Sequence, residues 1–97
     1  MAYKVIVSPK AQEEFYDAID YYNDVSAIVP EKFVGAIQKA YHNLSVDPFF
    51  GIRYHKIRAI PVKGFPYLLF FIVDEQNFEV IVLSCFHTSK NPHKYPY

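Results

Sequence analysis

A run of seven consecutive apolar residues, 67–73, places the strongest constraint on how this chain folds. Its β-branched and aromatic content is typical of a strand, and a strand that is apolar at every position is expected to be covered on both faces. Shorter β-rich runs stand on either side of it, at about 54–62 and 79–87. The connecting segments, 63–66 and 74–77, have the lengths of antiparallel hairpin connections, so the second half of the chain predicts a meander with 67–73 at its centre.

The first half of the chain predicts a strand followed by two helices. Residues 3–7 are β-branched and aromatic, and they stop at Ser8-Pro9, where serine can cap a helix and proline suits its first turn. Apolar residues then recur at helical spacing to about residue 22, and again from Pro30 until Asp47-Pro48 ends the second helix. The short break between the helices predicts an antiparallel hairpin.

Together these elements predict an α+β domain of order β-α-α-β-β-β, with the helix hairpin packed on one face of a mainly antiparallel sheet. A chain of 97 residues has room for a single domain, which we expect to span residues 1–97. Phe70, in the middle of the apolar strand, should be buried on both faces of the sheet or under the helices. The helix pair can cover only one face of the sheet, so apolar residues on the other face predict a shared surface or a bound partner.

Composition excludes several classes of protein. Ten Lys plus Arg balance ten Asp plus Glu, which argues against a general nucleic-acid coat. The longest apolar stretch, nine residues from Phe65 to Val73, is too short to span a membrane, which takes about twenty. The start of the chain lacks a basic leader and a cleavage site, and the single Cys85 cannot form an internal disulfide. We therefore expect a cytoplasmic protein with no membrane partner.

We expect neither a metal nor another cofactor. No Cys/His spacing resembles a zinc site. The carboxylates of the first helix lie along one face without a second cluster at ligand spacing, so we interpret them as a solvated face. The three glycines stand singly, so there is no phosphate-binding loop.

The end of the chain carries groups suited to acid–base chemistry. His87 ends the last predicted strand, and Lys90 and Tyr95 follow it. With Lys56 or Arg58, they could act on a phosphodiester, His87 exchanging a proton and the cations stabilising developing charge. A histidine at a strand end is more often a hydrogen-bonded structural residue, and from the residue pattern alone we favour that interpretation.

Four cations, Arg53, Lys56, Arg58 and Lys63, lie in or beside the predicted strand 54–62. Alternation along a strand places Lys56 and Arg58 on one face. Two interpretations stand about equal. These cations bind phosphates or an acidic protein partner, or they form a solvated strand face that discourages aggregation.

The order of elements and three motifs resemble the RelE/ParE family of toxins from bacterial type II toxin–antitoxin modules. The motifs are Val5-Ile6-Val7-Ser8-Pro9-Lys10-Ala11, Lys63-Gly64-Phe65-Pro66-Tyr67, and Val80-Ile81-Val82-Leu83-Ser84-Cys85-Phe86-His87 with Lys90-Asn91-Pro92 after it. The resemblance spans nearly the whole chain. It implies a small cytosolic toxin held inactive by a cognate antitoxin, usually encoded alongside, whose C-terminal segment wraps the toxin.

Members of the family that this chain resembles have one of two activities. Ribonuclease members cut messenger RNA in the ribosome, often with an Arg after the aromatic residue that opens the middle strand, and here Leu68 follows Tyr67. The segment Gly64-Phe65-Pro66-Tyr67 and the ending Phe86-His87 with Pro92 look more like the ParE branch, whose studied members act on DNA gyrase.

The resemblance therefore implies a ParE-like toxin, of the kind associated with plasmid stabilisation, that inhibits growth by binding a replication target such as DNA gyrase. One alternative is a RelE-like ribosome-dependent mRNA endoribonuclease that uses His87, Arg58, Lys90 and Tyr95. Another is an inactive antitoxin-binding module. Whether the chain is an enzyme thus stays open, and its apolar surface is compatible with a homodimer or a heteromeric complex.

Overall fold

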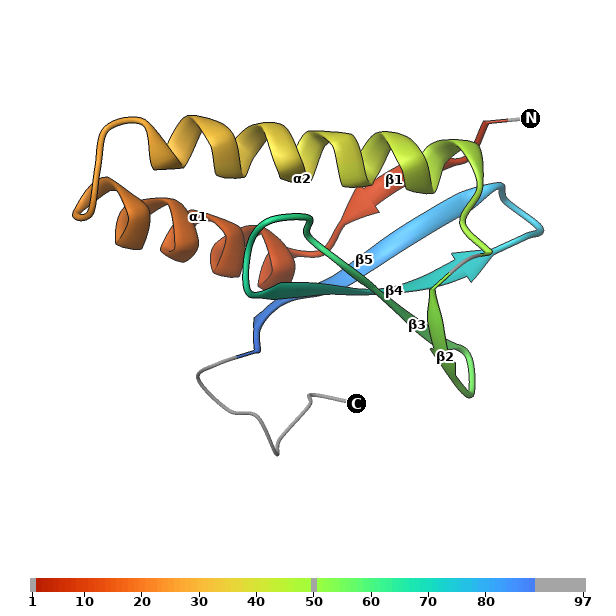
Figure 1. The fold of residues 1–97 in the computed structure, drawn as a ribbon. Coiled ribbons are helices and arrows are strands. Elements are labelled where there is room, and N and C mark those ends of the chain that lie inside the picture. The colour runs from red at the N-terminus through yellow and green to blue at the C-terminus, as the bar shows by residue number, and fades with distance from the viewer. Residues whose placement is uncertain (1, 50, 89–97) are drawn as a thin grey trace.

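The computed structural model describes residues 2–49 and 51–88 (Figure 1). The elements in chain order are β1 (Lys4–Val7), α1 (Pro9–Asn23), α2 (Val29–Val46), β2 (Ile52–Tyr54), β3 (Ile57–Pro61), β4 (Tyr67–Asp74) and β5 (Glu79–His87). The predicted α+β class is confirmed, as is the placement of one strand and two helices ahead of the meander. Two predicted site residues, Lys90 and Tyr95, lie outside the described residues.

The first helix begins where its capping signals predict. The Ser8 hydroxyl oxygen accepts a hydrogen bond from the Ala11 N–H at 3.2 Å, and Pro9 occupies the first turn. The same hydroxyl donates to the carbonyl of Leu83 on β5 at 3.1 Å, so one side chain both starts α1 and ties it to the sheet. The second helix begins at Val29 and ends before Asp47, as the sequence indicates.

The strands form one mixed five-stranded sheet in the order β1-β5-β4-β3-β2. β1 runs parallel to β5, and the other three pairs are antiparallel, which confirms a mainly antiparallel sheet. β4 lies in the middle, as its continuous apolar run predicts. The pairing of β4 with β5 shifts register between Phe70 and Phe71, an irregularity that places an extra residue in β5.

The predicted single strand 54–62 is wrong, because the chain turns at His55 and Lys56 and separates β2 from β3. His55 has a φ of 56°, which is a left-handed conformation suited to a tight turn and excluded from a continuous strand. Lys56 therefore does not share a strand face with Arg58. No Asn-Gly or Asp-Gly pair marks the turn, so the residue pattern gave no signal for it.

The main core lies between the helix hairpin and one face of the sheet (Figure 1). Phe33 and Ile37 from α2 meet Leu69 and Phe71 from β4, and all are at most 2% exposed. Burying an apolar side chain of this size stabilises the fold by roughly 1.5–3 kcal/mol. Among the described residues, no helix is long and apolar enough to cross a membrane.

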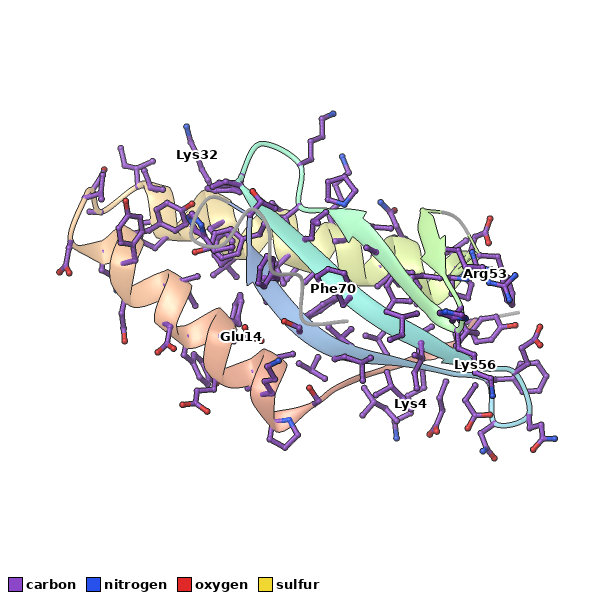
Figure 2. All side chains as sticks on the ribbon, turned by 90° about the horizontal axis from the view of Figure 1, so that it is seen from below. Lys4, Glu14, Lys32, Arg53, Lys56 and Phe70 are labelled. Atoms are coloured by element: carbon purple, nitrogen blue, oxygen red, sulfur yellow. The ribbon has the colours of Figure 1, made fainter. Side chains whose placement is uncertain are left out.

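Phe70 is buried as predicted, with 6% of its surface exposed, yet it lies outside the main core. Side chains alternate along β4, so Leu69 and Phe71 point toward the helices and Phe70 points to the opposite face. There its ring packs against Phe86 with the centroids 6.0 Å apart. In Figure 2, which views the molecule from below, Phe70 lies near the middle of the face turned away from α2.

Candidate functional site

Three of the four predicted partner-binding cations lie together beside the turn between β2 and β3. Arg53, Lys56 and Arg58, here called the basic hairpin, line a hollow of about 500 Å³. The other residues that line it are Phe49, Ile72, Val73 and Glu75. Figure 2 shows Arg53 and Lys56 at the same end of the sheet, with Phe70 between them and Glu14.

The backbone orients both arginines of the basic hairpin. Arg53 donates from Nε to the His55 carbonyl oxygen at 2.7 Å, and Arg58 donates from Nη1 to the Phe49 carbonyl oxygen at 2.8 Å. The Arg58 guanidinium also lies over the Phe49 ring, with its Cζ atom 5.5 Å from the ring centroid, in a cation–π contact. A guanidinium has five N–H donors, so each arginine keeps donors that can bind an anion.

Lys63, the fourth predicted cation, lies apart from the basic hairpin. It is exposed in the turn between β3 and β4 and, with Lys39 of α2, lines a separate hollow of about 340 Å³. The remaining residues that line this hollow are Gly35, Ala36, Ala40, Ile60 and Pro61. The structure therefore provides an apolar groove between α2 and β3 whose charged lining residues are lysines.

His87 lies at the end of β5, where it pairs with Tyr67 of β4. The imidazole and phenol rings meet edge to face, with their centroids 4.9 Å apart. Both residues line a hollow of about 170 Å³ that also contains Glu14 and Asp17 of α1. Among the described residues that line this hollow, the charged groups near His87 are the carboxylates of Glu14 and Asp17.

Arg58 and His87, two of the predicted catalytic residues, do not lie in one site. Arg58 pairs with Phe71 and His87 pairs with Tyr67, and these two partners stand four positions apart on β4. Four positions span about 13 Å along a strand, and β3 and β5 are separated by a further two strand spacings of about 5 Å each. The other two predicted catalytic residues, Lys90 and Tyr95, lie outside the described residues.

The residue pattern missed a polar contact between α1 and β5. Glu14, which the sequence placed on a solvated helix face, is half-buried, and its Oε1 atom accepts a hydrogen bond from the Ser84 hydroxyl at 2.8 Å. Ser84 is fully buried. A serine inside an otherwise apolar strand was the one available signal, because a buried hydroxyl requires a partner.

Burial keeps two neighbouring groups, the Cys85 thiol and the Tyr67 phenol, protonated at neutral pH. Burial, with the nearby Glu14 carboxylate adding to the shift, raises the pKa of the Cys85 thiol to about 12. It also raises the pKa of the Tyr67 phenol, with Tyr22 adding to the shift. Neither group therefore serves as a base near neutral pH. Within the described part of the chain, no three His, Cys, Asp or Glu side chains are placed to hold a metal ion.

Solved structures with the same arrangement are bacterial toxins and their complexes. The toxin–antitoxin complex RelBE2 from Mycobacterium tuberculosis matches with a TM-score of 0.65 and 17% identity, over 90% of this chain and 99% of that one. A chromosomal ParDE system from P. aeruginosa matches at 0.62 and 19%, over 89% and 96%. A mutant of the E. coli toxin RelE in the free state matches at 0.65 and 18%, over 95% and 90%. The fold is thus that of the RelE- and ParE-type toxins.

A family model described as the ParE toxin of the type II toxin–antitoxin system parDE matches residues 5–92. The chain therefore belongs to this toxin family. A comparison with curated proteins gives no significant match.

Proposed function

We propose that this chain is the toxin of a type II toxin–antitoxin pair and that it arrests growth by binding a target rather than by cutting RNA. The separation of Arg58 from His87 carries this choice. Cleavage of a phosphodiester requires the proton-transfer group and the charge-stabilising cations to converge on one phosphate. His87 instead shares its hollow with Glu14 and Asp17, whose carboxylates would repel a phosphate.

The proposed target belongs to the replication machinery, with DNA gyrase as the leading candidate. The match to the ParE family model over residues 5–92 supports this choice. Leu68 also supports it, because that position follows the aromatic residue opening the middle strand, where ribonuclease relatives often carry an arginine. Under this proposal the toxin acts in the cytoplasm and serves in plasmid stabilisation, and His87 has a structural role against Tyr67.

The proposed regulator is a cognate antitoxin. RelBE2 and ParDE, two of the similar structures, are toxin–antitoxin systems, which supports a partner of this kind. The groove between α2 and β3 offers Ala36 and Pro61 as apolar contacts, and Lys39 and Lys63 as contacts for acidic side chains. We therefore place one contact of the antitoxin in this groove.

Induced expression tests the proposal. The wild-type chain should arrest bacterial growth, and co-expression of its cognate antitoxin should restore it. His87→Ala should keep its toxicity while its circular dichroism spectrum stays that of the wild type. A folded but non-toxic His87→Ala protein would favour the ribonuclease alternative. A wild-type chain that accumulates without arresting growth would favour the inactive antitoxin-binding module.

A further inference from the structure

The two arginines of the basic hairpin stand opposite each other on neighbouring strands. Arg53 of β2 and Arg58 of β3 form a register pair. Side chains at such positions start from Cβ atoms about 4.5–5.5 Å apart, and like charges placed there destabilise a sheet. Lys56 adds a third positive charge to the hollow, and Glu75 is the one carboxylate among the residues that line it. The fold therefore holds an excess of positive charge that its own stability does not require.

Backbone carbonyl groups hold both arginine side chains in place. The carbonyl oxygens of His55 and Phe49 fix one nitrogen of each guanidinium, at 2.7 and 2.8 Å. Arg58 is further held by its contact with the Phe49 ring and is half-buried. Two oriented guanidinium groups with donors to spare match the geometry of carboxylates, which accept paired N–H bonds.

Exposed apolar side chains adjoin the basic hairpin. Phe49 is 44% exposed and Phe78 is 43% exposed, and together we call them the aromatic strip. The Tyr3 ring lies between the two phenylalanines, with centroid distances of 5.9 Å to Phe49 and 5.7 Å to Phe78. Phe78 has a φ of 52°, which is strained for a bulky residue, and this turn presents its ring at the surface. Phe49 also lines the hollow beside the basic hairpin, so the two surfaces are continuous.

We propose that the basic hairpin and the aromatic strip together bind an acidic segment of a partner protein, with its carboxylates on Arg53 and Arg58 and its apolar side chains on the strip. A nucleic-acid strand fits less well, because Arg58 and Tyr3 already contact the Phe49 ring on which a base would stack. The zero net charge also provides no general attraction for a polyanion. This site does not require the chain to be toxic.

The test is titration of the purified protein with two fluorescent probes, a synthetic peptide of glutamates interspersed with leucines and an oligouridine of equal charge. The peptide should bind at least tenfold more tightly than the oligouridine. Arg53→Gln should weaken peptide binding at least fivefold, and Arg53→Lys should recover only part of the loss because an ammonium lacks the paired donors. The melting temperature of Arg53→Gln should be no lower than that of the wild type, because the repulsion is gone.

Lys32→Gln is the matched control, since it removes the same charge from an exposed residue of α2 that lies outside both the basic hairpin and the groove between α2 and β3. It should leave peptide binding within twofold of the wild type. Equal losses in Lys32→Gln and Arg53→Gln would reduce the effect to net charge and overturn the proposal. Tighter binding of the oligouridine would assign the hairpin to nucleic acid, and absence of peptide binding would remove the site. Growth is not measured, so this result is separate from that of the toxicity test.

Discussion

Cys85 shows how a single buried residue sets the stability of this protein at alkaline pH. Its thiol is 2% exposed and lies in the main core, and burial raises its pKa to about 12. In the unfolded chain the pKa of a cysteine is about 8.5. At neutral pH the thiol is protonated in both states, so the contribution of Cys85 to the free energy of unfolding does not vary there.

Between about pH 9 and 12 the unfolded chain releases a proton that the folded chain retains, so the free energy of unfolding falls as pH rises. Urea unfolding at pH 8 and pH 10.5 should show the wild type losing about 2 kcal/mol more than Cys85→Ala over this interval. The comparison with Cys85→Ala removes the parallel contributions of the buried tyrosines. Equal losses in the two proteins would show that Cys85 is not protected from ionisation.

Gly51 and Gly64 have positive φ values for different structural reasons. Gly51 has a φ of 99°, and a Cβ atom there would lie 2.6 Å from the Ala59 carbonyl oxygen. Gly64 has a φ of 86° with no atom within 4 Å of the same position. Gly51→Ala should therefore lose about 3 kcal/mol of stability or more, from backbone strain plus a steric clash. Gly64→Ala should lose only about 1 kcal/mol, from backbone strain.

Thermal denaturation of the two alanine variants measures this difference directly. Losses of equal size would mean that the start of β2 can move away from Ala59, and the close packing of β2 on β3 would then be wrong. The wild type and both variants should retain the same far-ultraviolet spectrum below their melting temperatures.

At the scale of whole elements, the two faces of β4 have different surroundings: one face packs under the helices and the other faces away from them. A run that is apolar at every position does not show which residue lies on which face. Phe71 is fully buried in the main core, whereas Phe70 packs against Phe86 on the opposite face. Phe71→Ala should cost about 3–5 kcal/mol because it opens a cavity under the helices. Phe70→Ala should cost less, about 1.5–3 kcal/mol, close to the loss of burial alone. Urea unfolding at pH 7 checks the order, and a larger loss for Phe70→Ala would contradict the assigned faces.

Local signals predicted the elements whose ends are set by a few neighbouring residues. Ser8 and Pro9 define the start of α1, and Asp47-Pro48 defines the end of α2. The turn at His55 was missed because its left-handed residue is neither Gly nor Asn. The parallel pairing of β1 with β5 joins residues about 75 positions apart, such as Val7 and Val82, and no local pattern specifies it.

The candidate site was predictable only in part for the same reason. Their closeness in the sequence predicted that Arg53, Lys56 and Arg58 act together, and the structure places them around one hollow. The same closeness predicted Lys63 as a fourth member, but Lys63 lines a different hollow. The repulsive pairing of Arg53 with Arg58 depends on the register of β2 and β3, so it emerged only with the turn in place. The contact of Glu14 with Ser84 joins residues 70 positions apart and depends on how α1 packs beside β5.

At the scale of the whole molecule, charge is divided between separate sites. Glu14 and Asp17 lie beside His87, and the basic hairpin lies beside another part of the sheet. This division supports binding rather than RNA cleavage, because among the described residues His87 and the cation Arg58 do not lie together. The fold and the family are shared by toxins that bind a target and toxins that cut RNA. An experiment on the cellular target is therefore needed to distinguish these two activities.

Pulse labelling of a bacterial host, with thymidine and methionine incorporation followed side by side in the first minutes after induction, tests this claim most directly. A toxin that binds a replication target should reduce thymidine incorporation first, with methionine incorporation falling later, and His87→Ala should give the same order. Immediate loss of methionine incorporation while thymidine incorporation continues would contradict the binding mechanism. It would direct attention back to His87, Arg58 and Lys90 as parts of a ribonuclease.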